Sequence, residues 1–155
     1  MMKKETFLLL LVLVLSACAA QPTQEPTPTP IPNAPYVLVQ EENSYAPKME
    51  DINLKQDGVL LTSVDLSERY DLTPIRAEFH VLGSMPTTCN QLRINVNPPN
   101  AKFEIRIEIY SISTPLPKCE NVFQQIDAVI LLGVYSPGKY TIWANDSYVG
   151  DFSSY

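Results

Sequence analysis

The three cysteines and the one histidine of this sequence are the side chains that could take part in the most kinds of chemistry. Cys18 ends an apolar N-terminal run, Cys89 and Cys119 lie in the second half of the chain, and His80 is the single histidine. Structural zinc sites need several Cys or His ligands at close spacing, and redox sites commonly use a Cys-x-x-Cys pair. Neither pattern occurs, so we predict no metal site and no redox site.

Other familiar catalytic and ion-binding patterns are also missing from the sequence. His80 could serve a Ser-His-Asp triad, but no Gly-x-Ser-x-Gly elbow accompanies it. The acidic pairs Glu41-Glu42 and Glu50-Asp51 lack the loop spacing of a calcium motif. The five glycines are scattered and make no phosphate-binding loop. We therefore predict no catalytic residue and no cofactor, and we expect the acidic pairs to lie on solvated surface.

Residues 1–17 have the three parts of a secretory signal peptide. Lys3 and Lys4 give a positive start, residues 7–15 are all apolar, and Ser16 and Ala17 are small. A membrane-spanning helix needs about 20 apolar residues, so a transmembrane anchor is the weaker interpretation of this run.

The junction Leu15-Ser16-Ala17-Cys18 resembles the lipobox of bacterial lipoproteins. The resemblance implies that Cys18 receives a diacylglyceryl thioether, becomes the mature N-terminus after cleavage, and is usually acylated on its amine with a chain such as palmitate. Two or three acyl chains hold a protein almost permanently in a bilayer. The resemblance therefore predicts an extracytoplasmic protein, lipid-anchored to the bacterial cell membrane. The alternative is an ordinary signal peptide cut near Ala17 or Ala20.

A proline-rich segment follows the junction cysteine. Residues 21–35 read QPTQEPTPTPIPNAP and contain six prolines. Proline fixes φ and removes backbone donors, so the segment favours an extended polyproline-II conformation. Residues 18–35 are thus predicted to be a semi-rigid tether, which at about 3.1 Å per residue reaches roughly 50 Å. An O-glycosylated stalk and a ligand for a proline-binding groove are the alternatives.

The charge balance limits the partners of the mature chain. The whole sequence carries a net charge of −6, and removal of residues 1–17 takes away Lys3, Lys4 and Glu5, which leaves −7. Such a chain repels phosphate backbones, so nucleic-acid binding is disfavoured.

Residues 36–155 contain short strand-like runs and no convincing helix. Turn residues separate the runs, and this arrangement predicts one domain, an antiparallel β-sandwich of seven or eight strands. One helical turn is conceivable over residues 120–127. The expected strands cover residues 36–40, 58–66, 74–82, 91–97, 102–112, 127–133, 138–145 and 148–152.

Alternation along these runs predicts which side chains face the core. The clearest run is 102–112, where Phe103, Ile105, Ile107 and Ile109 alternate with charged residues. The run 127–133 lacks alternation, which would suit a strand covered on both faces. Three further sets are predicted: an apolar face of Leu60, Thr62, Val64 and Leu66, an apolar face of Ile75, Ala77, Phe79 and Val81, and an opposite polar face of Arg76, Glu78 and His80.

The ending GKYTIWANDSYVGDF resembles the last two strands of bacterial immunoglobulin-like domains. In that family a pattern like Gly-x-Tyr-x-Val-x-Val-Asn-Gly precedes a terminal Phe, and here Asp146 stands where Gly is usual. The resemblance implies an immunoglobulin-like sandwich and carries no function.

Trp143 is the only tryptophan, and its surroundings depend on the turn of this last hairpin. A two-residue turn at Asn145-Asp146 would pair Ile142 with Val149 and Trp143 with Tyr148, whereas a three-residue turn would pair Trp143 with Val149. An exposed Trp143–Tyr148 pair could stack on sugar rings or anchor a partner protein. Ordinary cross-strand packing is the alternative role.

Cys89 and Cys119 are an even pair in an oxidising compartment once Cys18 carries lipid, so we predict a disulfide between them. A turn centred on residues 98–101 would place Cys89 opposite Tyr110. The segment 113–118 would then have to fold back to bring Cys119 alongside.

These features together predict a lipid-anchored, non-catalytic binding module associated with the cell envelope. Its expected partners are membrane lipid, through acylated Cys18, and a cell-surface protein or glycan. The rival functions are a small secreted enzyme with an unrecognised site, and an accessory lipoprotein that binds solutes or glycans.

Overall fold

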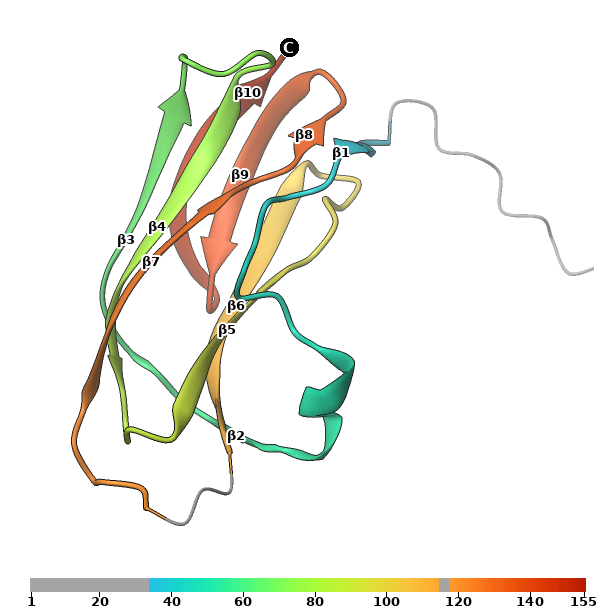
Figure 1. Cartoon of the computed structure of the whole chain (residues 1–155). Helices are drawn as coiled ribbons and strands as arrows, with labels where there is room; N and C mark the ends of the chain where they lie inside the picture. Colours follow the sequence, from blue (N-terminus) through green and yellow to red (C-terminus); the bar gives the residue numbers. More distant parts are fainter. Residues whose placement is uncertain (1–33, 115–117) are drawn as a thin grey trace, which may run out of the picture. The chain divides into compact units, whose positions relative to one another are not determined.

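A computed structural model describes residues 34–114 and 118–155 (Figure 1). The predicted signal peptide, Cys18 and all but the last two residues of the predicted tether lie outside the described residues. The described chain forms one short 3₁₀ helix and ten strands: β1 Val37–Val39, η1 Met49–Asn53, β2 Lys55–Asp57, β3 Leu60–Arg69, β4 Arg76–Met85, β5 Asn90–Val96, β6 Glu104–Ser113, β7 Gln124–Leu131, β8 Val134–Tyr135, β9 Gly138–Ala144 and β10 Ser147–Ser154.

The strands form a β-sandwich, as predicted. One sheet has the order β3-β4-β7, and the other has the order β10-β9-β6-β2, with β5 also paired to β6. A two-stranded ribbon of β1 and β8 completes the fold (Figure 1). Eight strands match the eight predicted runs; β2 and β8 were not predicted because three and two residues are too short to show a period. No helix in the described ranges is long and apolar enough to cross a membrane.

One strand pair departs from the antiparallel arrangement that we expected. β6 and β9 are parallel, with Arg106 opposite Trp143 and Ile107 opposite Ala144. β9 lies along the first half of β6, and β2 lies along its last three residues. The two neighbours therefore share one edge of β6, and the turn after β9 falls in the interval between them.

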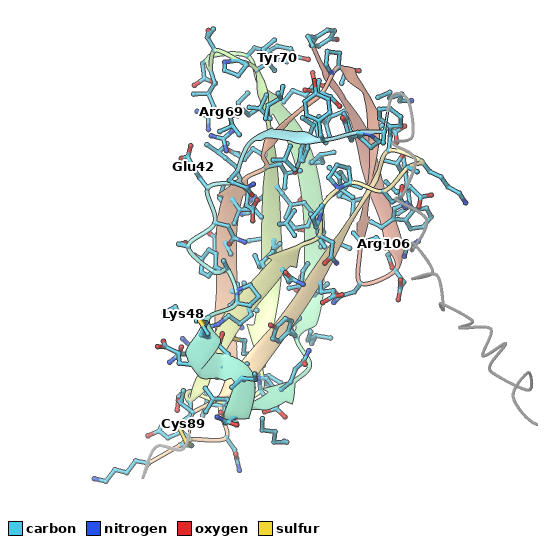
Figure 2. The ribbon with its side chains drawn as sticks, turned by 90° about the vertical axis from the view of Figure 1, so that its right-hand side faces the viewer. Glu42, Lys48, Arg69, Tyr70, Cys89 and Arg106 are labelled. Carbon is cyan, nitrogen blue, oxygen red and sulfur yellow. A yellow bond between two sulfur atoms is a disulfide. The ribbon has the colours of Figure 1, made fainter. Side chains whose placement is uncertain are left out.

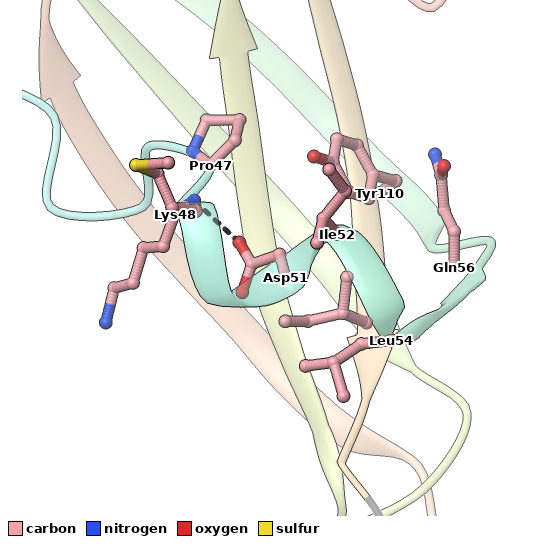
Figure 3. A pocket seen from close by; sticks show the side chains of 9 residues that line it. Pro47, Lys48, Asp51, Ile52, Leu54, Gln56 and Tyr110 are labelled. Carbon is pink, nitrogen blue, oxygen red and sulfur yellow. Dashed lines mark hydrogen bonds between the residues drawn. The ribbon is translucent and has the colours of Figure 1, made fainter.

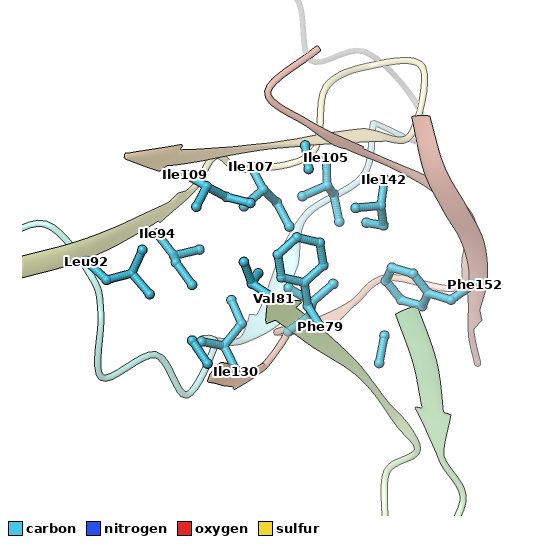
Figure 4. Packing of buried hydrophobic residues seen from close by; sticks show 14 of the residues in the cluster. Phe79, Val81, Leu92, Ile94, Ile105, Ile107, Ile109, Ile130, Ile142 and Phe152 are labelled. Carbon is cyan, nitrogen blue, oxygen red and sulfur yellow. The ribbon is translucent and has the colours of Figure 1, made fainter. Parts of the chain in front are cut away.

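The core lies between the two large sheets (Figure 4). The alternation predicted for β6 is confirmed, because Ile105, Ile107 and Ile109 are buried and Phe103 packs against them. The apolar face predicted for β4 is confirmed at Ala77, Phe79 and Val81. Burial of such side chains, each worth about 1.5–3 kcal/mol, is the main favourable term for a domain of this size.

In two strands, β7 and β3, the side chains that face solvent differ from those that we predicted. β7 has only one covered face, since Val129 is 46% exposed and Asp127 also points outward. The helical turn that was conceivable over residues 120–127 does not form, because residues 124–127 belong to β7 and residues 120–123 are irregular. In β3 a bulge between Leu61 and Ser63 reverses the alternation, so Leu61 rather than Leu60 packs toward the core.

Arg76 is buried, although we predicted it on a polar face. Its Nε donates to the Leu132 carbonyl at 3.0 Å, and Nη2 donates to the carbonyls of Gln40 and Leu131 at 3.3 Å. Its Nη1 pairs with Glu42, which Figure 2 labels. Carbonyl acceptors just after β1 and at the end of β7 satisfy the guanidinium, so its burial is tolerated.

The Asp51 side chain is largely covered as well, whereas the Glu50-Asp51 pair was expected on solvated surface. Helix η1 crosses the outer face of β5 and places Asp51 against Arg93. Arg93 donates from Nε at 2.6 Å and from Nη2 at 2.8 Å, and the two side chains are only 9% and 6% exposed. This bidentate bond holds the pKa of Asp51 at about 2.

Cys89 and Cys119 form a disulfide, as predicted, with 5.4 Å between their Cα atoms. The hairpin register was wrong, because Val96 pairs with Ile107 and the ten residues 97–106 lie between them. Cys89 therefore lies beside Thr114, whose backbone N and Oγ1 donate to the Cys89 carbonyl at 3.2 and 3.0 Å, and not beside Tyr110. Residues 115–117 of the segment that was expected to fold back lie outside the described residues.

The start of β9 explains the Gly-x-Tyr part of the terminal pattern. The Tyr140 hydroxyl donates to the Ser136 carbonyl at 2.6 Å and ties the start of β9 to the segment before it. Tyr140 also packs on Phe103, with ring centroids 5.3 Å apart. A Cβ at Gly138 would lie 2.6 Å from the Phe103 ring, so glycine leaves the space that this packing requires.

Candidate binding surface

The outer face of the five-stranded sheet carries an aromatic and polar cluster around Trp143. We call this cluster the Trp143 surface. It comprises Asn95, Arg106, Glu108, Trp143, Asp146 and Tyr148.

The last hairpin places Trp143 beside Tyr148. Asn145 and Asp146 have φ values of 42° and 64°, so the predicted two-residue turn is confirmed. Trp143 pairs with Tyr148 in an edge-on contact, with ring centroids 5.9 Å apart and planes at 74°. The predicted pairing of Ile142 with Val149 is wrong, because a bulge after Tyr148 brings Gly150 opposite Ile142.

Tyr148 remains 57% exposed, so the aromatic pair is open to solvent on one side. The bulge that follows it turns the strand and redirects its side chains. An exposed aromatic ring next to a half-buried one is a common anchor for a ligand.

Arg106 lies over the Trp143 ring because β6 and β9 run parallel in this register. Its guanidinium carbon is 5.7 Å from the ring centroid, within the range of a cation–π contact. Nη1 donates to Asp146 Oδ1 at 3.0 Å across the turn. Figure 2 shows Arg106 at the outer side of the sheet.

Glu108 is the second acidic group of the surface. It faces Asn95 across the β5–β6 pair, and Asn95 Nδ2 donates to one of its carboxylate oxygens at 3.2 Å. Asn97 Nδ2 lies at 3.5 Å from the other oxygen. These amides orient the carboxylate and leave some of its acceptor sites open to a ligand.

The Asn145 side chain fixes the turn that carries Asp146. Its Nδ2 donates to the Ile109 carbonyl at 2.9 Å, and its Oδ1 accepts from the Ile109 amide at 2.8 Å. Its own amide donates to the Ile107 carbonyl at 3.0 Å. Asn145 thus occupies the place of a strand residue in the interval between β9 and β2.

A recess of about 300 Å³ lies within the Trp143 surface, at the lower end of the range for small-molecule sites. The Trp143 Nε1 is buried and has no hydrogen-bond acceptor among the residues that the structure describes. A buried donor without a partner is rare in native proteins. Arg106, Ile107, Glu108, Trp143, Asn145 and Asp146 line the recess.

His80 belongs to the opposite sheet and is not brought to Trp143. Its Nε2 lies 2.8 Å from Asp127 Oδ1, across the β4–β7 pair, with Asp65 opposite it on β3. Within residues 34–114 and 118–155, no group of three or more His, Cys, Asp or Glu is arranged to hold a metal ion.

A second hollow of about 390 Å³ lies between η1 and the sheet, and sequence reasoning did not anticipate it (Figure 3). The segment before β2 shows no periodic pattern, so nothing in the sequence placed it over β6. The lining of this hollow is mainly apolar. Burial raises the pKa of Tyr110, which is one of the lining residues. The Lys48 amide donates to Asp51 Oδ2 at 2.7 Å beside it and helps to close η1.

The fold and this surface define a small β-sandwich domain with an aromatic, polar outer face. Comparison with known families gives the same class, because residues 79–154 match the family described as the ORF11 β-sandwich domain. The matched part runs from within β4 to β10 and includes the disulfide and Trp143. Neither a curated protein nor a solved structure matches the chain.

Proposed function

We propose that the protein is a lipid-anchored, extracytoplasmic binding module that engages its ligand through the Trp143 surface. The lipobox-like junction at Cys18 and the proline-rich segment after it support the anchoring. Acyl chains give an acidic chain a membrane attachment that its charge does not provide.

The observation that carries the binding role is the open recess of about 300 Å³ beside the half-buried Trp143 and the exposed Tyr148. The groups around it are a guanidinium, carboxylates and side-chain amides, several already oriented by neighbours. Such groups fix a ligand by hydrogen bonds. This arrangement supports a binding role and no catalytic one.

Anchoring is tested by cell fractionation of full-length protein and its Cys18→Ser variant. The expected result is acyl labelling and membrane association of the first, and loss of both in the second. Continued acyl labelling of Cys18→Ser would refute the lipoprotein assignment.

Binding is tested by sedimentation of detergent-solubilised protein with isolated envelope fragments. We expect Tyr148→Ala to lower the bound fraction at least fivefold. Tyr155→Ala is the matched control, since Tyr155 is also an exposed tyrosine, at the C-terminus and away from the Trp143 surface. Equal binding of all three proteins would place the ligand site elsewhere.

A further inference from the structure

We infer that the ligand of the Trp143 surface is an uncharged glycan, an inference that rests on the binding function proposed above. Three properties of the surface carry it: its charge, its hydrogen-bonding groups, and the polarity around its aromatic rings.

The charge of the surface disfavours an anionic ligand. The nearest cations are already paired: Arg106 with Asp146 at 3.0 Å, and Lys139, which lies near Tyr148, with Asp151 at 2.9 Å. Glu108 adds a third carboxylate, which only neutral amides contact. A phosphate, sulfate or uronate would meet this excess of negative charge at short range and be repelled. Anionic polymers are therefore disfavoured as ligands.

The hydrogen-bonding groups suit hydroxyl groups. A sugar hydroxyl both donates and accepts, so it can donate to the Glu108 carboxylate and accept from a guanidinium or amide N–H of the surface. The exposed Tyr148 ring offers an apolar face to the C–H groups of a sugar ring. The recess of about 300 Å³ suits one or two sugar rings rather than a folded partner.

A protein ligand fits this surface less well. The centres of protein interfaces are depleted in charged residues. Here charged groups stand directly beside the aromatic pair, with Arg106 over the indole and Asp146 on the adjoining turn. Covering these charged groups with an apolar protein surface would remove their hydrogen bonds to water without replacement. Sugar hydroxyls would replace those hydrogen bonds, so the free-energy cost of binding a glycan is lower.

The test uses the emission of Trp143, which is the only tryptophan and so reports on this surface alone. Detergent-solubilised full-length protein is titrated with hexamers of β-1,4-linked N-acetylglucosamine, glucose, xylose and mannose, and with anionic oligogalacturonate. We expect a saturable change of emission with at least one neutral hexamer and none with oligogalacturonate. Glu108→Gln and Tyr148→Ala keep the reporter and should weaken that response at least tenfold, whereas Tyr155→Ala should not.

The outcomes separate the glycan from the binding function. No response to any neutral hexamer, or an equal response to oligogalacturonate, would overturn the glycan inference. If envelope binding still depended on Tyr148 in that case, the proposed binding function of the Trp143 surface would be retained, with a protein as its ligand. If envelope binding were also indifferent to Tyr148, the proposed function itself would fail.

Discussion

Asn145 and Ile109 exchange two hydrogen bonds, although Asn145 belongs to a turn and uses its side chain for both. The side-chain amide supplies the donor and the acceptor that a neighbouring strand would supply, at the point where β9 has ended and β2 has not begun. This contact holds the rim of the Trp143 recess in place.

Replacement of Asn145 should therefore destabilise the domain. Asn145→Ala loses both bonds and puts alanine at a φ of 42°, so we expect a loss of about 2–4 kcal/mol in the free energy of unfolding. Asn145→Gly loses the bonds without the backbone strain and should cost about 1 kcal/mol less. Urea unfolding measures both, with exposed Asn121→Ala as the control. Equal stability of Asn145→Ala and Asn121→Ala would contradict this role.

The buried pair of Arg93 and Asp51 predicts a pH effect on stability. Arg93 lowers the pKa of Asp51 from 3.8 to about 2 in the folded chain. The stabilisation is therefore complete above pH 4 and is lost as the pH falls toward 2. In Asp51→Asn this part of the acid-induced decrease should disappear from urea unfolding measured between pH 2 and 6.

At neutral pH Asp51→Asn should cost about 3 kcal/mol, because it leaves a buried guanidinium without its counter-ion. Glu50→Gln is the matched control, since Glu50 is an exposed neighbour with a loose contact of 3.7 Å to Lys48. Its effect should stay below about 0.5 kcal/mol. An acid profile of Asp51→Asn that matched the wild type would show that the pair contributes nothing.

These two sites also show where sequence reasoning succeeds and where it stops. The alternation of β6 predicted its core face, and Asn145-Asp146 predicted the two-residue turn, because both depend on local geometry. Burial of Asp51 depends on a segment that folds across β5 from a distance. Periodicity carries no information about such a charge pair.

The Trp143 surface also combines features that the sequence predicts with features that it does not. The Trp143–Tyr148 pair followed from the turn. The position of Arg106 over the indole did not, because it depends on the parallel register of two strands far apart in the chain. The bulge after Tyr148 was equally invisible, since Gly150 is compatible with either register.

Gly138 should not tolerate a side chain. Gly138→Ala would place a Cβ 2.6 Å from the Phe103 ring and should cost about 1–3 kcal/mol through displacement of that ring. Gly58→Ala is the control, because no atom lies within 4 Å of the added Cβ. Thermal unfolding compares them, and a Gly138→Ala protein as stable as Gly58→Ala would refute the packing argument.

The Cys89–Cys119 disulfide closes a loop with a sequence separation of 30 residues. Its removal by the double substitution to Ser should cost about 3–4 kcal/mol in the loop-entropy model. Urea unfolding in a Cys18→Ser background avoids the third thiol. Non-reducing peptide mass spectrometry should find Cys89 linked to Cys119, and free thiols in the folded protein would contradict the structure.

The most direct test of the binding role is the emission of Trp143 during titration with isolated envelope fragments. We predict a saturable shift that follows the amount of protein bound and that Tyr148→Ala lowers at least fivefold. Protein that sediments with the fragments while its Trp143 emission stays unchanged would show that the Trp143 surface is not the binding site.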